Sequence, residues 1–589
     1  MEIRGARPFP FGRVTIDYET PGLSPYAAVR PFICGLEDEG GNVILTRPGD
    51  GNWWKVPKII QDPNIEKVAH GSKFELKHSY HMGYIPRGKW HDTMGKAVFV
   101  DEYQKINLGA LSSRYLKDDT KDIVKKWLEE NGRRIRRETG RDPNYTDVPP
   151  ELLETYLEGD LDKTLRLDNL WRHVETDFKQ LYEMEIDLSH DLARMEDHGL
   201  HLDLAYVEKQ IIALRPEMLR LEQELWAMAG VRFNPDSPRE LSYILETMGL
   251  DTGMRNKDGT LKTKFDLLVL MDPNPFINKL IRWRGLKKIV GTYFIPFLQN
   301  AYGDVLHGTL WQYGKDDAIV TGRLSSSDPN LQNFPGGGRG AVRNPVLKEL
   351  GPLVRRAVVP PPGYSLLSFD YKQIEMVIFS CLAGDKRIIN DIRNGLDVYV
   401  AHGKIIFGKN AFDNLPEKVY KAKRFECKEL CLSLIYGMGL KRFANRIGKS
   451  LGEAKKIRND YFRNSPLARD CMIRTTRDLL VKGYVQDTYG RRYHVPKEMA
   501  YKATNALCQG PAATVAKRGV IKARQLEHFG FKPIMMIHDE LMGIVPIENL
   551  KACAEAGKEL LEEKGTFPVT IKVDAKASNV CWGDQREIE

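Results

Sequence analysis

Apolar and polar positions divide the chain into stretches of different character. Over the first 170 residues, short apolar runs such as 14–16 alternate with helical stretches such as 151–170, which is typical of an α/β unit. Over 203–229, apolar residues recur at spacings of three and four, which predicts a helix with one apolar face, bent at Pro216. Helical patterns dominate 386–480, and residues 336–352, rich in Gly and Pro, are predicted to form a loop. The chain is therefore predicted to be a multi-domain α/β protein.

Two apolar runs in the C-terminal half each deliver an aspartate at the end of a predicted buried strand. One run precedes Asp370, and the other precedes Asp539, with strands predicted over 534–545. Buried carboxylates are costly unless they are paired, hydrogen-bonded or bound to a metal. Brought together, the two would form a two-cation site of the kind used in phosphoryl and nucleotidyl transfer. Asp539 is predicted to lie at the tip of a hairpin.

A helical segment between these runs carries two cations and an aromatic residue on one face. Arg424 and Lys428 are one helical turn apart, and Tyr436 follows two turns later. This arrangement suits a triphosphate at one end and a base at the other, although for the two cations taken alone a solvated basic face is the favoured interpretation. Segments 321–335 and 505–510 are rich in hydroxyl and amide groups, which suit contacts to DNA or an ordinary polar loop.

Composition narrows the class of protein further. The chain has 589 residues, too many for one core, with 42% hydrophobic and 28% charged residues. Its net charge of +9 is compatible with a polyanionic partner. No apolar run reaches membrane-spanning length, and the N-terminus lacks a signal segment. The eight cysteines form no CxxC pair, which favours reduced cysteines and a cytoplasmic location, in a host cell if the protein is encoded by a phage.

Together these segments resemble the motifs of family A DNA polymerases. DYKQIE (370–375), RFECK (424–428) and HDE (538–540) follow TGRLSSSDPNLQN (321–333) in the family's order. The resemblance covers about 190–589 and implies a polymerase domain over 176–589 with the right-hand fold. Its thumb would span about 186–305, its palm 306–385 and 520–589, and its fingers 386–519.

The resemblance implies template-directed addition of dNTPs to a primer 3′-OH by a monomeric enzyme acting on primer–template DNA. Asp370 and Asp539 would hold two Mg²⁺ ions with the Tyr371 carbonyl, and Glu540 would assist. The implied nucleotide-binding residues are Arg424, Lys428, Glu375, Gln373, Tyr436, Leu432, Tyr371 and Tyr399, with Lys428 also a catalytic acid and Glu375 excluding a ribose 2′-hydroxyl. The implied DNA-binding residues are Arg323, Asn330, Gln332, Asn333, Asn505, Gln509 and His538.

The N-terminal region, 1–175, resembles the RNase H-like 3′–5′ proofreading exonuclease domain of the same family. Asp17 and Glu19 match its DxE motif, and Tyr156 and Asp160 match its YxxxD motif. At the middle motif Glu75 replaces the family's aspartate, which keeps the charge but moves the carboxylate by one methylene. The resemblance implies Mg²⁺ or Mn²⁺ held by Asp17, Glu19 and Asp160, with Glu75 and Tyr156 also catalytic. A retained scaffold without activity is the alternative, and no 5′-nuclease domain is expected.

Two other classes are weighed against a DNA polymerase. A single-subunit RNA polymerase shares the palm aspartates, but Glu375 and the exonuclease-like region argue against it. A non-enzymatic nucleic-acid-binding protein would keep basic and amide patches without needing both aspartates. Leu432 stands where the best-known family members carry Phe or Tyr, and Tyr399 stands where many members carry His, which leaves details of nucleotide selection open. The compact form suggests a phage replicase with accessory replication proteins, while a cellular or organellar repair role stays open.

Overall fold

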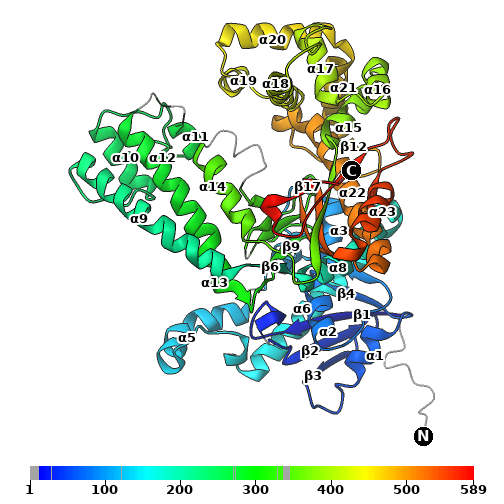
Figure 1. Cartoon of the computed structure of the whole chain (residues 1–589). Coiled ribbons are helices and arrows are strands. Elements are labelled where there is room, and N and C mark those ends of the chain that lie inside the picture. Colours follow the sequence, from blue (N-terminus) through cyan, green and yellow to red (C-terminus); the bar gives the residue numbers. More distant parts are fainter. Residues whose placement is uncertain are drawn as a thin grey trace.

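The computed structural model describes residues 12–588 apart from 28, 121, 270, 272–273, 328 and 336–344. Figure 1 shows an N-terminal unit built on one sheet, a central sheet formed by the C-terminal half, and two groups of helices that diverge from the central sheet. None of the helices described is long and apolar enough to cross a membrane. All eight cysteines are free, and seven of them are buried.

The N-terminal sheet is mixed, with the strand order β3-β2-β1-β4-β5. Its central strand, β1 (Arg13–Glu19), pairs antiparallel with β2 (Ile33–Asp38) and parallel with β4 (Glu66–Ala69). The outer strands are β3 (Val43–Thr46) and β5 (Trp90–Asp92). The apolar side chains of β1 pack with α1 (Lys55–Gln61) and α2 (Lys73–His81), and α6 (Pro150–Leu170) contacts β1 and β2. A Cβ at Gly35 of β2 would lie 2.7 Å from Leu161 of α6, so this close approach needs glycine.

One group of helices follows this unit. Its members are α9 (Leu204–Ala229), α10 (Pro238–Thr247), α12 (Pro275–Lys288), α13 (Ile295–Asn300) and α14 (Pro345–Arg356). The predicted helix over 203–229 is confirmed, with Pro216 inside it. The predicted loop over 336–352 is wrong from residue 345 onward, since α14 begins there with a proline. Pro fits the first helical turn because its missing N–H has no partner there in any case. Residues 336–344 lie outside the described residues.

The central sheet is antiparallel throughout, with the order β14-β15-β11-β16-β17. Strands β14 (Lys532–Ile537) and β15 (Glu540–Pro546) form the predicted hairpin, and β11 (Tyr364–Tyr371) pairs with β15 and β16 (Val573–Ser578). The edge strand is β17 (Arg586–Glu587). Asp370 lies opposite Glu540 on one side and Asp574 on the other. The sheet thus gathers carboxylates from three strands at one end.

The second group of helices carries the basic segment. It contains α15 (Ile374–Ala383), α16 (Lys386–Arg393), α17 (Val398–Phe407), α18 (Glu417–Ile435), α19 (Leu440–Ile447), α20 (Leu451–Asn464) and α21 (Pro466–Lys482). The buried α22 (Ala503–Lys522) connects this group to the central sheet, and α23 (Leu550–Leu561) covers the sheet. Figure 1 shows α16–α20 at the top of the molecule, away from α9–α12.

Helix α8 (Lys179–His198) joins the N-terminal unit to the rest of the chain through buried charges. Lys517 of α22 donates to both carboxylate oxygens of Glu185, at 2.8 and 3.0 Å, and Gln312 donates to the same carboxylate at 2.6 Å. The Arg491 guanidinium lies 3.6 Å from Glu185 and 5.3 Å from the ring of Phe99 in α3 (Thr93–Val100). Because these charges are almost fully buried, the junction depends on their mutual pairing.

Candidate functional site

The carboxylates predicted at the strand ends meet at one end of the central sheet. Asp370 is the penultimate residue of β11, and Asp539 lies in the β14–β15 turn beside His538, which adopts a left-handed backbone with φ of +56°. A backbone hydrogen bond links the end of β11 to this turn: the Tyr371 amide donates to the Asp539 carbonyl at 3.3 Å. The Asp370 side chain is 42% exposed, and the nearest cation is Lys576, whose Nζ lies 4.0 Å away.

Burial and mutual repulsion make the charged forms of these carboxylates unfavourable unless a cation is bound. Partial burial, with the negative charges of Asp539 and Glu540, raises the pKa of Asp370 to about 7. Burial and the charge of Glu375 raise the pKa of Asp539 as well, and Arg323 only partly opposes that shift. Carboxylate and carbonyl oxygens are the ligands that Mg²⁺ prefers. Asp370, Asp539 and the Tyr371 carbonyl therefore form a donor set that fits a divalent cation.

The side-chain amide of Gln332 supports the β14–β15 hairpin through two hydrogen bonds, a role that the sequence did not predict. Its Nε2 donates to the Met536 carbonyl, and its Oε1 accepts from the His538 amide at 2.9 Å. Gln332 is 8% exposed, so this side chain supports the turn that carries Asp539. Its predicted contact with DNA stays a prediction. Asn330 and Asn333 are exposed on either side of it.

Glu375 forms an ion pair with Arg323, which brings the predicted sugar-sensing residue together with a predicted DNA contact. Glu375 lies in the first turn of α15 and is 8% exposed. Its charge reaches Asp539, as the raised pKa of that aspartate indicates. The predicted sugar, primer and metal residues thus lie in one neighbourhood.

The predicted triphosphate residues lie on α18 and face α17. Arg424 donates to Asp397 at 2.6 Å, and Gln373 donates to the same carboxylate at 2.5 Å. The Tyr399 ring lies under both predicted cations, 5.5 Å from the Arg424 guanidinium and 5.9 Å from Lys428 Nζ. The structure therefore brings together the predicted nucleotide residues of three helices, and Asp397 is a further partner that sequence reasoning missed.

Two predicted nucleotide-binding residues at the end of α18 lie in different environments. Tyr436 ends the helix and is half-buried, whereas Leu432 is only 2% exposed and packs in the main hydrophobic core. The sugar contact expected of Leu432 stays a prediction. On α22, Asn505 and Gln509 are partly exposed, and Asn505 Oδ1 is buried without a hydrogen-bond partner among the residues that the structure describes. Such an acceptor suits a donor from a bound ligand.

A second acidic cluster lies in the N-terminal unit. Asp17 and Glu19 come from the central strand β1, Glu75 from the first turn of α2, and Asp160 from α6. Tyr156 lies one turn before Asp160 on the same helix, and its hydroxyl partly opposes the rise that burial causes in the pKa of Asp160. All five predicted residues of this site are therefore brought to one place. Asp122, which caps α5 (Ile123–Thr139), adds a negative charge that the sequence did not identify.

Burial dominates the electrostatics of this cluster. Burial and the neighbouring charge of Asp160 raise the pKa of Asp17 to about 7, and burial with Asp17 raises that of Glu19 to about 9. Burial likewise raises the pKa of Glu75 well above its usual range. Glu75 Oε2 finds no hydrogen-bond partner within the described part of the chain. A divalent cation would remove this electrostatic cost, so the donor set fits one.

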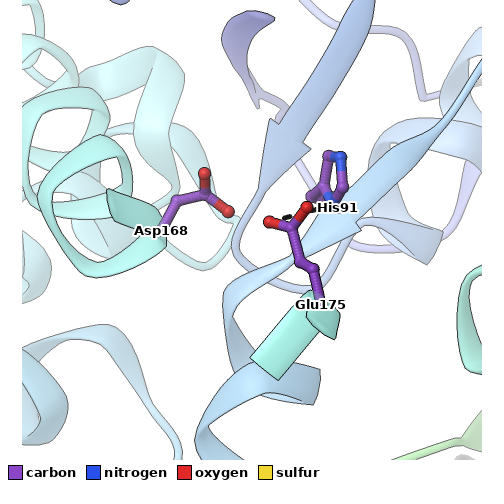
Figure 2. A group of neighbouring side chains, drawn as sticks. All are labelled: His91, Asp168 and Glu175. Carbon is purple, nitrogen blue, oxygen red and sulfur yellow. Dashed lines mark ion pairs between the residues drawn. The ribbon is translucent and has the colours of Figure 1, made fainter. Parts of the chain in front are cut away.

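His91, Asp168 and Glu175 form a third cluster, drawn in Figure 2, whose ligand atoms lie within 4.8 Å of one another. Two buried cations already neutralise it. Arg13 donates to Asp168 at 2.7 Å and to Glu175 at 3.0 Å, and Lys96 donates to Asp168 at 2.6 Å. Despite burial, these partners lower the pKa of Glu175 to about 2. The cluster is thus an ion-pair network that anchors β1 to α6, and we assign it no metal.

Comparison with known proteins decides the family. The profile of DNA polymerase family A matches residues 204–584. The chain belongs to this family. It is 32% identical over 430 residues to the thermostable DNA polymerase I of Thermus aquaticus, covering 69% of this chain and 49% of that protein. It is 29% identical over 545 residues to DNA polymerase I of Pseudomonas aeruginosa, covering 88% of this chain and 56% of that protein.

The fold comparison extends over almost the whole chain. The POL domain of Pol1 from M. smegmatis, solved in complex with DNA primer-template and dNTP, superposes with a TM-score of 0.80 at 22% identity, covering 97% of this chain and 96% of that one. The N-terminal unit is therefore part of the shared fold. The chain spans about half the length of the curated relatives that it matches first.

Proposed function

We propose that this protein is a DNA-directed DNA polymerase that adds dNTPs to the 3′-OH of a primer paired with a template. The observation that carries the proposal is the pair of strand-end aspartates, Asp370 and Asp539, in a family A fold with a raised pKa at both carboxylates. Asp370, Asp539 and the Tyr371 carbonyl would hold two Mg²⁺ ions, with Glu540 close by. The bound ions would activate the primer 3′-OH and stabilise the leaving pyrophosphate.

The remaining residues of the site bind and select the substrates. Arg424 and Lys428 neutralise the triphosphate, with Lys428 able to donate a proton to the pyrophosphate, and Tyr436 closes over the new base pair. For Arg424 to bind phosphate, its bond to Asp397 must be replaced. Glu375, held by Arg323, fills the space that a ribose 2′-hydroxyl would need. Arg323, Asn505, Gln509 and His538 contact the primer–template.

We also propose that the N-terminal unit is an RNase H-like 3′–5′ exonuclease domain that removes unpaired primer ends. Its support is the convergence of Asp17, Glu19, Glu75 and Asp160 with Tyr156, and the buried Glu75 oxygen that lacks a partner among the described residues. Asp17, Glu19 and Asp160 would hold Mg²⁺ or Mn²⁺, and Tyr156 would orient the attacking water. A phage-type replicative role, an accessory replication protein, a monomeric state and a cytoplasmic location stay predictions.

One experiment tests both activities. The full chain is incubated with a 5′-labelled primer–template and Mg²⁺, with and without the four dNTPs, and the products are separated by length. We expect extension to the template end with dNTPs and progressive shortening without them. Replacing the dNTPs by ribonucleotides separates this proposal from an RNA polymerase, since Glu375 should prevent their use. A primer that stays unchanged in every lane would refute the proposal.

A further inference from the structure

A cavity of about 420 Å³ lies between the N-terminal unit and the segment that follows α13. None of its lining residues belongs to either acidic site. Its wall comes from η1 (Pro25–Ala27) and the residues just after it, the end of α2, the end of α8 and the strand β7 (Ala301–Tyr302), with His307, which follows β8 (Val305–Leu306). The side chains that matter for its chemistry are Tyr26, Arg30, His81, Asp197, Tyr302 and His307.

Half of the residues that line this cavity carry an aromatic ring. Tyr26 stacks on His307 with their ring centroids 3.7 Å apart and an angle of 10° between planes, and His81 meets the Tyr26 ring edge-on at 4.9 Å. Tyr302 stands 6.1 Å from His307 and is 41% exposed, so part of its ring stays open to a ligand. The cavity therefore offers an open aromatic face next to a fixed aromatic stack.

Polar groups are placed around these rings. Arg30 is exposed at the wall, and the Asp197 carboxylate is held by His81 at 2.9 Å. The Tyr26 hydroxyl is buried and has no hydrogen-bond partner in the part of the chain that the structure describes. A cavity of this size, with the Arg30 guanidinium, the Asp197 carboxylate and the Tyr26 hydroxyl beside aromatic rings, is suited to a small planar ligand that offers an anionic group to Arg30 and a hydrogen-bond donor to Asp197.

We propose that this cavity binds one unpaired nucleotide unit, with its base against Tyr302 and its phosphate toward Arg30. Aromatic stacking with a neighbouring cation is how proteins hold single-stranded nucleic acid without a strict sequence preference. The location supports this choice, because α2 carries Glu75 in its first turn and His81 at its end. Six residues of helix separate them by about 9 Å, within reach of neighbouring nucleotides on one strand. The inference goes beyond the proposed synthesis and does not depend on it.

Binding is tested with the full chain in EDTA and without dNTPs, so that neither synthesis nor degradation takes place. The probe is an oligonucleotide of about ten deoxyadenosines that carries 2-aminopurine, whose fluorescence falls when the base stacks. Tyr302→Ala is expected to weaken binding about tenfold and to remove part of the quenching, while Tyr302→Phe keeps both. Arg30→Gln should weaken binding and lower its salt dependence.

Tyr243→Ala is the matched control, since Tyr243 of α10 is 68% exposed and lies outside this cavity. Titration with dAMP then separates the two sources of the ligand. Competition by dAMP that requires Tyr302 identifies a free nucleotide, and lack of competition identifies a strand; both outcomes support the site. Equal affinity and equal quenching in wild type, Tyr302→Ala and Arg30→Gln would overturn it. Because the assay involves no synthesis, a failed primer extension would leave its result unaffected.

Discussion

The two acidic sites of this protein both consist of several carboxylate side chains, but the surroundings of these carboxylates differ. In the central sheet, Asp370 is 42% exposed, Lys576 lies 4.0 Å away, and Arg323 acts on Asp539. In the N-terminal unit, Glu19 and Glu75 are 8% and 3% exposed. Burial raises the pKa of Glu19 to about 9, whereas that of Asp370 rises to about 7.

This difference in burial should affect how strongly the charge state of each site depends on pH and on a bound metal ion. The central site has cations of its own, Lys576 and Arg323, which lessen the repulsion between its carboxylates, and its Asp370 side chain is more exposed to solvent. The N-terminal site holds its carboxylates deeper, and only Lys163, 3.4 Å from Asp160, is a direct cationic partner among the contacts described. We expect the N-terminal site to depend more strongly on pH and on a bound cation than the central site does.

The largest effect is expected at the central site. Asp370→Ala or Asp539→Ala should lower the rate of primer extension at least about a thousandfold, because each removes one of the carboxylates that we propose to hold the metal ions. DNA affinity should stay within a few fold of wild type, since it rests on phosphate contacts. Extension is measured by gel and affinity by anisotropy. Robust extension by either variant would show that the pair is not the metal site.

At the N-terminal site, Asp17→Ala should lower the degradation of single-stranded DNA at least about a hundredfold while leaving primer extension intact. The physical reason is that Asp17 comes from the central strand of a unit separate from the central sheet. Degradation is followed on a 5′-labelled strand in Mn²⁺. If purified Asp17→Ala degrades DNA as wild type does, the nuclease lies elsewhere.

Glu75→Asp should change degradation by about tenfold, because catalytic groups must lie within about 0.5 Å of the productive geometry. The shorter side chain restores the residue type that the family motif carries at this place. Higher activity in the variant would mean that the extra methylene displaces the carboxylate. Lower activity would mean that the surrounding backbone has adapted to glutamate, and no change would rule out a role in catalysis. Glu75→Gln, which keeps the shape, is the control for charge.

The smallest effect is expected on stability. The raised pKa values of Asp17 and Glu19 mean that, without metal, the folded state favours their protonated forms. Their contribution to stability is complete below about pH 4 and is lost as pH rises through about 7 and 9. Saturating Mn²⁺ should therefore raise the melting temperature by about 5 °C more at pH 9 than at pH 6. Glu19→Gln should reduce this difference more than Asp370→Asn does; the reverse order would contradict the comparison.

The sequence predicted the acidic residues that the structure brings together, but not the side chains that position the elements around them. The alternation and apolar runs predicted the β14–β15 hairpin and α9, because their signals are local. The motifs located Asp370, Asp539 and Asp17 for the same reason. The support of the hairpin by Gln332 and the capture of Arg424 by Asp397 join distant segments, so no spacing indicates them. The start of α14 differs from the prediction because Gly and Pro in 336–352 favour a loop, although a proline also fits the first turn of a helix.

The buried ion pair between Glu185 and Lys517 determines where the chain can be cut to give a stable C-terminal fragment. A fragment that begins after α8 would retain Lys517 and Arg491 in a buried environment and lose their shared carboxylate. Removing one member of a buried pair costs about 3–5 kcal/mol, a large share of the stability of a typical domain. A fragment that begins near Lys179 would keep the pair. Helix α8 therefore belongs to the C-terminal part in any excision of the N-terminal unit, and limited proteolysis should preserve it.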